Sequence, residues 1–539
     1  MKFKSEFIVL TILAVCFGLV LFLFIDELWP MPEVNLYPDH RQIYNRACFY
    51  FNSNGYDLTG YDHEVYLEVR EDELDFLESY YPGKLINQLI NSNISPFRYN
   101  ILFKKQGEQT VFFISFNKNL DIISSQISLP YDHPGARISV DKAFRLISFF
   151  LADTPSLNQK GYSIRELPHR TDYQFFFSRD SFSVFLINQE ETYGLAGNKI
   201  SLIQRNINIP SSWKKLRRAD LSFQDSLRIF GMILMLAGGI YAFILLLTSL
   251  HQRRLPVNRV LSVVLIISLC WLLTNLFQQS LLFRSWNPLV PKWLSYVQTI
   301  VYLFISDFPV LLLLLALVGA AEYLITNRDK TESFWKLTRG KIFYPQVGLS
   351  SARGFLVGLI CGGMISGAIL MINLLSPVHI SVQPRGFYLY ILNSNIPALT
   401  SLLYFILIAV IEEFGYRAFG ITWLTKLTKH TWIALFITSI IYGLTHASLT
   451  FLPPQKPVWG RAVMMILVGL VWGIIYIKYD LLTVIISHLT ADLFIFNWPG
   501  LRSGSYTTLI LSVVVISIPL LPFWGWELNK FFKKIKVKT

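Results

Sequence analysis

The stretch FIVLTILAVCFGLVLFLFI, residues 7–25, is an unbroken apolar block near the start of the chain. A helix of about 18 or more such residues is long enough to cross the roughly 30 Å hydrocarbon core of a bilayer. About 200 residues of ordinary polar sequence follow it, and from about residue 227 to 524 the apolar blocks are nearly continuous. The pattern predicts a polytopic α-helical membrane protein with an α+β domain inserted after the first span.

The apolar blocks predict about ten membrane spans. Lys2 and Lys4 precede the first block, as in a secretory signal peptide, but no small-x-small cleavage pattern follows it. An uncleaved signal anchor is therefore the better interpretation of this block. The expected spans are residues 7–25, 229–250, 260–283, 299–325, 354–375, 396–424, 432–452, 461–478, 481–497 and 506–524.

The net charge of +13 is concentrated beside the apolar blocks, where basic residues determine topology. If the N-terminus is cytoplasmic, the basic clusters at residues 251–259, 328–341, 426–429 and 530–538 all fall on the cytoplasmic side. We therefore expect both termini in the cytoplasm and residues of about 30–226 outside it, in a bacterial cell (inner) membrane. Because topology accounts for the charge, no nucleic acid partner is expected.

Composition divides the chain into five parts. These are a signal anchor (1–29), an extracytoplasmic α+β domain (30–226), additional transmembrane helices (227–345), a membrane core that carries the candidate site (346–500), and a last helix with a basic tail (501–539).

The extracytoplasmic part contains β-rich runs at residues 65–69, 110–116, 174–177 and 183–187. Helix-like stretches at 39–51 and 139–151 precede them, and Ser139 or Asp141 could cap the second. A helix followed by strands, twice at about 100-residue spacing, suggests a degenerate duplication. No nucleophile–base pair or metal-ligand cluster appears here, so we expect a module that binds a ligand or partner or gates substrate.

The informative residues are charged side chains inside the later spans, where an ionisable group costs roughly 2.5–3.5 kcal/mol or more. Glu413 and Arg417 are four residues apart and can form an ion pair on one helical face. Glu412 is rotated about 100° from Glu413 and needs another partner. The candidates are His446 in the next span and the pair His488 and Asp492, four residues apart in the ninth span.

Estimated depths of roughly 12–21 Å from the cytoplasmic helix ends place Glu412, His446, His488 and Asp492 in one layer. A polar network that only joins helices is the alternative, but it has little use for two acids and two histidines. Three glycines in these spans are consistent with close helix approach: Gly415, Gly443 and Gly469.

Other polar residues in the spans have simpler interpretations. Asp307 lies beside Pro309, so we expect a local kink in the helix and a nearby hydrogen-bond partner for the Asp307 carboxyl group. Glu322 is expected to extend from a helix end toward water. Asn275 and the neighbouring residues 278–279 read as helix–helix contacts or an interfacial end.

A carboxylate that faces an imidazole across a small cavity can activate a water molecule for attack on a carbonyl. A second histidine with a polar neighbour can stabilise the oxyanion that develops. Histidines and carboxylates are also zinc ligands, so Glu412, His446, His488 and Asp492 could instead hold a divalent metal. The sequence contains no HExxH, Gly-x-Ser-Gly or Gly-x-Gly-Asp motif of other intramembrane proteases.

Three motifs in order resemble the signatures of the CPBP family, which comprises type II CAAX prenyl proteases and bacteriocin-processing or Abi-type membrane proteins. The resemblance covers about residues 350–500. The motifs are Glu412-Glu413-x-x-x-Arg417, an aromatic-x-x-x-His run ending at His446, and His488-x-x-x-Asp492.

The resemblance implies that Glu412 and His446 activate water, that His488 with Asp492 stabilises the oxyanion, and that the second glutamate and the arginine are structural. It also implies a cavity open to the cytoplasm. Two positions depart from the family pattern: Tyr442 stands where Phe is common, and Asp492 where Asn is usual. An aspartate donates no hydrogen bond unless it is protonated, which favours a His-orienting or metal-ligand role for Asp492.

We expect an intramembrane endopeptidase, of glutamic or metallo type, that acts on peptide or membrane-protein substrates at the bilayer. The alternatives are a non-catalytic scaffold that keeps the fold, and a transporter with a proton relay. A transporter usually has two related membrane halves, and the sequence shows none.

Overall fold

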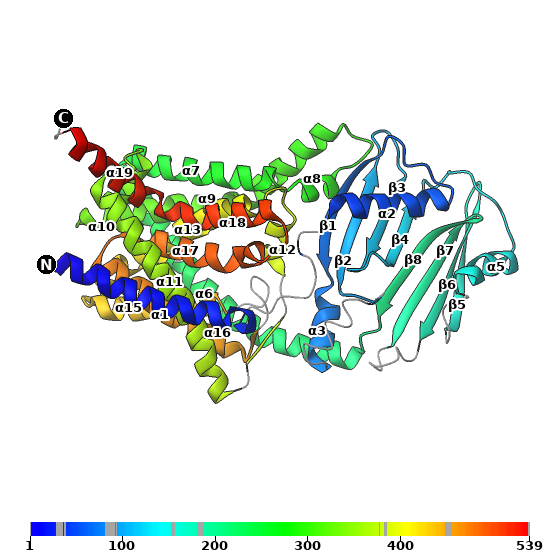
Figure 1. The fold of residues 1–539 in the computed structure, drawn as a ribbon, viewed down its shortest axis with the longest axis horizontal. Coiled ribbons are helices and arrows are strands. Elements are labelled where there is room, and N and C mark those ends of the chain that lie inside the picture. The colour runs from blue at the N-terminus through cyan, green and yellow to red at the C-terminus, as the bar shows by residue number, and fades with distance from the viewer. Residues whose placement is uncertain are drawn as a thin grey trace. The chain divides into compact units, whose positions relative to one another are not determined.

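The computed structural model describes residues 2–28, 36, 39–80, 92, 94–151, 157–179, 188–376, 378–381, 385–447 and 455–536. By their contacts these residues form two compact units (Figure 1). The membrane unit comprises 1–31, 220–277 and 302–539, and the sheet unit comprises 32–219 and 278–301. The β-rich run predicted at 183–187 lies outside the described residues.

Within the described ranges, nine helical segments are long and apolar enough to cross a membrane, which confirms a polytopic α-helical membrane protein. The predicted span at 432–452 corresponds to a shorter apolar helix, α15 (Thr431–Thr445), of 15 residues. The nine segments are formed by α1 (Lys2–Leu28), α6 (Ser211–His251), α7 (Val257–Leu276), α9 (Lys292–Leu324), α11 (Pro345–Leu375), α13 (Pro397–Glu412) with η1 (Glu413–Ile421) and α14 (Thr422–Thr428), α16 (Val458–Lys478), α17 (Leu481–Leu501), and α18 (Tyr506–Ser517) with η2 (Ile518–Leu520) and α19 (Leu521–Lys536). Shorter elements of this unit are α10 (Asp329–Thr338), α12 (Gly386–Leu392) and the paired β9 (His379–Ile380) and β10 (Gln455–Lys456).

The predicted span at 260–283 extends too far, because α7 ends at Leu276 and a separate helix, α8 (Gln279–Ser285), begins three residues later. Near the end of α7, the buried Asn275 accepts a hydrogen bond from the Tyr390 hydroxyl at 3.0 Å. Asn275 therefore makes the helix–helix contact that the sequence suggested.

Helix α17 is the most buried span of the membrane unit, and α11 packs along it. Two glycines of α11 allow this close approach. A Cβ atom at Gly354 would lie 2.6 Å from the Ile486 Cβ, and one at Gly358 would lie 2.7 Å from the Ser487 carbonyl oxygen. Small residues four apart are a common means of bringing membrane helices together. The glycines of α11 thus help to position α17, which carries two of the predicted site residues.

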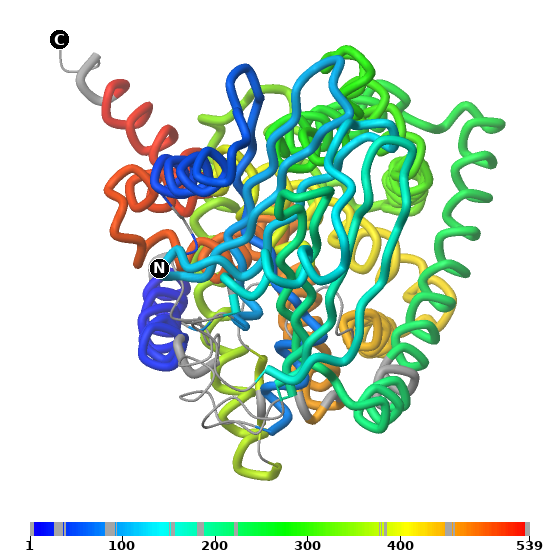
Figure 2. The backbone as a smooth tube through the Cα atoms, turned by 90° about the vertical axis from the view of Figure 1, so that its right-hand side faces the viewer, coloured from blue at the N-terminus to red at the C-terminus, as the bar shows by residue number. Residues whose placement is uncertain are grey.

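The sheet unit contains one eight-stranded antiparallel sheet of order β1-β2-β3-β4-β8-β7-β6-β5, which confirms an α+β domain after the first span. It consists of two four-stranded meanders, β1–β4 in blue to light blue and β5–β8 in cyan to green (Figure 2). They are joined through β4 and β8, where Ser125 pairs with Ile203. Three of the predicted β-rich runs fall in β1, β3 and β6. The strands are β1 (Asp62–Val69), β2 (Phe97–Lys104), β3 (Val111–Phe116), β4 (Ile122–Ser128), β5 (Asn158–Glu166), β6 (Thr171–Arg179), β7 (Gln189–Ala196) and β8 (Lys199–Ile207).

A helix precedes each meander, as predicted: α2 (His40–Ser53) and α5 (Val140–Leu151). The Asp39 carboxylate accepts hydrogen bonds from the first-turn amides of α2, and the Ser139 hydroxyl accepts one at the start of α5. From α2, Phe51 packs against Phe112 of β3, with ring centroids 5.2 Å apart, and α5 packs on β6. The order of helix and four strands thus occurs twice, whereas α3 (Glu71–Tyr80) is present only in the first half. A duplication remains our interpretation of this repeat.

Residues 278–301 join the sheet unit through Lys104 of β2. Its ammonium group donates hydrogen bonds to the carbonyl oxygens of Phe283, Arg284 and Trp286 at 3.0, 2.9 and 2.6 Å. Burial, with a smaller contribution from the Arg284 charge, lowers the pKa of Lys104 to about 8. One side chain thus satisfies three carbonyls at the end of α8.

Candidate active site

The segment that carries the first motif changes its helical form at the site. Glu412 is the last residue of α13, and from Glu413 to Ile421 the backbone forms a π-helix before α14 begins. A π-helical stretch inside an α-helix is rare and is often found at functional sites. It changes the directions in which successive side chains point, so neighbouring glutamates can reach one site from different sides.

The predicted ion pair of Glu413 and Arg417 is confirmed. The Arg417 Nη1 lies 3.1 Å from the Glu413 Oε1, and both side chains are buried. The guanidinium carbon also lies 4.6 Å from the ring centroid of Tyr442 and 5.3 Å from that of Trp472. Charge pairing and aromatic contact together compensate the burial of this arginine.

His446 lies just past the end of α15, where its orientation is fixed by the backbone. Its Nδ1 lies 2.8 Å from the Tyr442 carbonyl oxygen, which can only accept a hydrogen bond, so Nδ1 carries the proton. In the neutral ring, Nε2 is then the atom with the free lone pair, and it lies 3.6 Å from the Glu412 Oε1. This separation is too long for a strong direct hydrogen bond but allows one water molecule to contact both groups.

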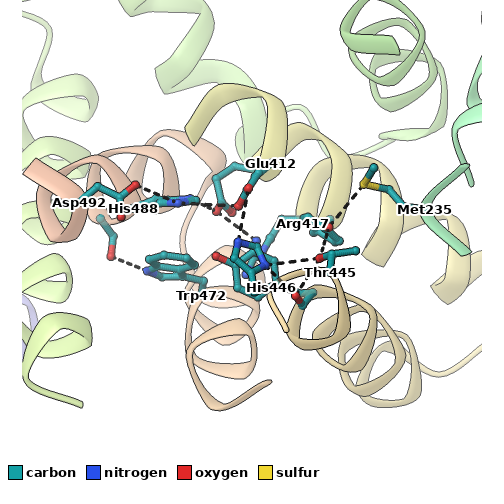
Figure 3. A network of polar contacts seen from close by, with 12 residues as sticks. Met235, Glu412, Arg417, Thr445, His446, Trp472, His488 and Asp492 are labelled. Atoms are coloured by element: carbon teal, nitrogen blue, oxygen red, sulfur yellow. Dashed lines mark hydrogen bonds and ion pairs between the residues drawn. The ribbon is translucent and has the colours of Figure 1, made fainter. Parts of the chain in front are cut away.

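His488 of α17 contacts three carboxylates. Its Nδ1 lies 2.8 Å from the Glu413 Oε1, and its Nε2 lies 3.3 Å from the Asp492 Oδ2 and 3.8 Å from the Glu412 Oε2 (Figure 3). A carboxylate oxygen thus stands ready to accept a hydrogen bond from either ring nitrogen that carries a proton. The Trp472 ring stacks on the imidazole with centroids 4.2 Å apart, which fixes the plane of the ring.

The four predicted catalytic residues line one cavity of about 350 Å³, whereas Glu413 and Arg417 lie behind its wall. Glu412, His446 and Asp492 are each about one-fifth exposed and His488 is buried. The Glu412 Oε2 has no hydrogen-bond partner among the described residues. Most of the remaining wall is apolar: Met232, Met235, Ile365, Phe387, Phe405, Ile408, Met464, Met465, Val468, Ala491, Ile495 and Phe496.

Sequence reasoning missed three contributors to the site. Trp472 stacks on His488 and donates a hydrogen bond from Nε1 to the Ser487 hydroxyl at 2.9 Å. Thr445 and Tyr416, whose hydroxyl oxygens lie 2.8 Å apart, pack beside His446. A lone tryptophan, threonine or tyrosine in an apolar span gives no sequence signal. Thr445 and Tyr416 do adjoin the motif residues His446 and Arg417, which could have raised the question, whereas Trp472 is 16 residues from His488.

The glycines near the motifs sit at close contacts, as expected. A Cβ atom at Gly443 would lie 2.6 Å from the Ala462 carbonyl oxygen, so α15 and α16 approach closely there. At Gly415 and Gly469 the nearest atoms would be 3.3 and 3.2 Å away, in Leu317 and Tyr442.

The other buried acids do not line this cavity. The half-buried Asp307 accepts a hydrogen bond from the Trp271 Nε1 at 2.7 Å, in keeping with a locally satisfied acid. The prediction that Glu322 extends toward water is wrong. Its side chain is buried and lies 2.9 Å from Arg328, 3.4 Å from Arg259 and 2.8 Å from the Trp335 Nε1, because neighbouring segments supply the donors.

Glu412, His446, His488 and Asp492 are also the candidate ligands for a divalent metal. Over the part of the chain that the structure describes, no three or more His, Cys, Asp or Glu side chains form a group placed to hold a metal ion. The Nδ1 atoms of His446 and His488 are engaged by Tyr442 and Glu413, which leaves one nitrogen of each ring toward the cavity. A histidine that binds a metal through one ring nitrogen commonly makes such a contact with the other, so the Nε2 atoms of His446 and His488 are the ones that would bind a metal held here.

Comparison with known families gives one match. Residues 394–494, from just before α13 into α17, match the family model described as type II CAAX prenyl endopeptidase Rce1-like. Neither a curated protein nor a solved structure matches the chain. The matched range contains all three motifs and supports a membrane protease, that is, a hydrolase. The chain is therefore an integral membrane protein that carries an Rce1-like domain of the CPBP family at residues 394–494.

Proposed function

We propose that this protein is a membrane-embedded endopeptidase in which Glu412 and His446 activate a water molecule. One observation carries the proposal: Glu412 lies between two imidazoles from different helices, with its oxygens 3.6 Å from the His446 Nε2 and 3.8 Å from the His488 Nε2. The family match supports the same class of reaction.

In the proposed reaction, a water molecule is hydrogen-bonded to the Glu412 Oε1 and the His446 Nε2. The carboxylate takes one proton as the water oxygen bonds to the substrate carbonyl carbon, and the carbonyl oxygen takes the negative charge. The C–N bond then breaks and the leaving nitrogen takes the proton from Glu412. The second proton of the water stays on the new carboxyl group, so a carboxylic acid and an amine are released, and the acid gives this proton to the amine or to solvent. The enzyme returns to its starting state.

His488 is proposed to stabilise the oxyanion from Nε2, because that atom belongs to a ring that lines the cavity and can donate a hydrogen bond there when it carries a proton. Glu413 and Trp472 are positioning residues that hold the ring by a hydrogen bond and by stacking. Asp492 is proposed to orient His488, a role that an aspartate can perform without donating a hydrogen bond.

The cavity wall supports a substrate with apolar side chains or an apolar attached group, because carbon-rich side chains form most of it. Methionines contribute four of these, and their flexible thioethers adapt to different shapes. We place the termini in the cytoplasm, as the basic residues predict, and the sheet domain outside, where it can contact a substrate or partner.

The test compares the full-length protein in lipid nanodiscs with Glu412→Gln and His446→Ala on a library of quenched fluorescent peptides. Glu527→Gln is the matched control, since Glu527 is half-exposed on α19 and pairs with Lys530. We expect each site substitution to lower the cleavage rate by about 10²–10⁴-fold and the control to leave it unchanged.

A chelator such as 1,10-phenanthroline forms the second arm. An unchanged rate supports the glutamate mechanism, and loss that zinc restores would replace it with a metal-dependent one. Equal cleavage by all variants would identify a contaminant, and a folded wild-type protein without any cleavage would favour the scaffold function.

A further inference from the structure

A second concave region of the membrane unit is lined mostly by charged side chains. It consists of a pocket of about 640 Å³ and an adjoining one of about 480 Å³, which share Arg254 and Arg328. We call this region the basic pocket. Its walls carry two acids, Glu322 and Glu332, and seven basic residues: Arg254, Arg259, Arg328, Lys336, Arg339, Lys341 and Lys426.

The two acids are already engaged. Glu322 is paired with Arg259 and Arg328, and Glu332 lies 2.6 Å from the Lys336 Nζ. Lys426 donates a hydrogen bond to the Leu324 carbonyl at 2.6 Å. The acids thus neutralise some of the basic residues and leave the pocket with an excess of positive charge.

Three cations of the pocket have no acidic partner among the described residues: Arg254, Arg339 and Lys341. All three are exposed. The hydroxyl of Thr331, which also lines the pocket, is fully buried and has no hydrogen-bond partner in the described part of the chain. A buried hydroxyl without a partner costs free energy, and an acceptor oxygen of a ligand would satisfy it.

The pocket lies where helices that cross the membrane end. Arg254 follows α6 and precedes α7, and Arg328 lies between α9 and α10. Because α7 is 20 residues long, about 30 Å, its end reaches the level of the lipid headgroups. Tyr323 and Trp335 line the pocket too, and aromatic residues of this kind are enriched at that level.

We propose that the basic pocket binds the phosphate group of an anionic phospholipid. Guanidinium groups match the geometry of phosphate oxygens, and basic pockets between membrane helices are a known means of binding anionic headgroups. Basic residues at a membrane surface are common, but here unpartnered cations and a buried, unsatisfied hydroxyl share one concave site. The binding is independent of the proposed peptidase reaction.

The experiment titrates the full-length protein in neutral detergent with dioleoylphosphatidylglycerol or dioleoylphosphatidylcholine and counts bound lipid by native mass spectrometry. The test variant carries Arg254→Gln, Arg339→Gln and Lys341→Gln. The matched control carries Lys429→Gln, Lys478→Gln and Lys533→Gln, which remove the same charge from exposed positions outside the pocket. Thr331→Val is a milder second variant that keeps the shape of the side chain.

We expect wild type and control to retain the anionic lipid in preference to the zwitterionic one. Each cation removed should weaken this binding roughly fivefold, so the test variant should lose roughly a hundredfold. Thr331→Val should lose about fivefold, which corresponds to one hydrogen bond.

Glycerol 3-phosphate and inorganic phosphate, added at constant ionic strength, distinguish a headgroup from a free phosphate compound. If glycerol 3-phosphate binds as tightly as the lipid and loses binding in the test variant, the site is a phosphate site with a soluble ligand. The proposal is overturned if wild type prefers neither the anionic lipid nor a phosphate, or if test and control variants weaken equally.

Discussion

His488 and Glu413, 75 residues apart in the sequence, are joined by a 2.8 Å contact between Nδ1 and Oε1. The same carboxylate oxygen lies 3.1 Å from the Arg417 Nη1. Glu413 does not line the cavity, and among the described residues its side chain forms hydrogen bonds with these two neighbours. One carboxylate therefore neutralises a buried guanidinium and orients an imidazole that faces the cavity.

Substitution of Glu413 separates these two contributions. Glu413→Leu leaves the buried Arg417 without its counter-charge, and we expect the free energy of unfolding to fall by about 3–5 kcal/mol. In the double variant Glu413→Leu, Arg417→Met, both charges are gone, so most of this stability should return. Thermal unfolding of the two variants in detergent measures the difference.

The double variant should nevertheless cleave peptide about a hundredfold more slowly than wild type, because His488 has lost the acceptor that holds its Nδ1. The Km should change less than kcat, since neither residue lines the cavity. A double variant that is both stable and fully active would show that Glu413 serves the fold alone.

Asp492 provides a test of how the site departs from the family pattern. Its Oδ2 lies 3.3 Å from the His488 Nε2, and an asparagine oxygen could accept the same hydrogen bond. We therefore expect Asp492→Asn to keep the cleavage rate within about tenfold, whereas Asp492→Leu should lower it by about 10²–10³-fold. If the asparagine variant is as inactive as the leucine variant, the negative charge itself is required.

Spacing within a motif predicted local pairs well. Residues four apart on a helix share a face, which gave the ion pair of Glu413 with Arg417 and the contact of His488 with Asp492. The prediction that Glu412 must find its partner on another helix also agrees with its position beside His446. These inferences needed only helix geometry and the cost of an unpaired charge in a membrane.

Helix geometry alone could not predict contacts between side chains from distant segments of the sequence. An α-helical register turns Glu413 about 100° away from Glu412, so the contact with His488 was not foreseen; the π-helix that starts at Glu413 alters that register. The partners of Glu322 were missed because they come from other segments. Likewise, no pattern in the sequence indicates that the Lys104 ammonium holds the carbonyls at the end of α8.

The carboxyl group of Glu64 in β1 is expected to make the stability of the sheet unit depend on pH. Burial raises the pKa of this carboxyl from 4.5 to about 7, and the Lys292 charge opposes the shift. The folded state therefore holds a proton that the unfolded chain releases, so the stability of β1 and β2 should fall as pH rises from 4.5 to 7. Hydrogen exchange of the strand amides in the full-length protein, corrected for intrinsic rates, measures this.

Glu64→Gln should remove this fall in protection, because the amide does not titrate. Glu166→Gln, at an exposed position on β5, is the matched control and should behave as wild type. Protection of β1 that increases from pH 4.5 to 7 in the wild-type protein would contradict the assignment.

Gly358 links the packing of α11 to the position of His488. A Cβ atom there would lie 2.6 Å from the Thr490 Cβ and 2.7 Å from the Ser487 carbonyl oxygen, and backbone cannot yield as a flexible side chain can. We expect Gly358→Ala to cost about 1–3 kcal/mol and to slow cleavage, since α17 must move away and take His488 with it. Gly367→Ala on the same helix meets no atom within 4 Å and should leave both unfolding temperature and cleavage rate unchanged. If the two variants have the same unfolding temperature and cleavage rate, α17 can accommodate a methyl group at Gly358, and α11 does not determine the position of His488.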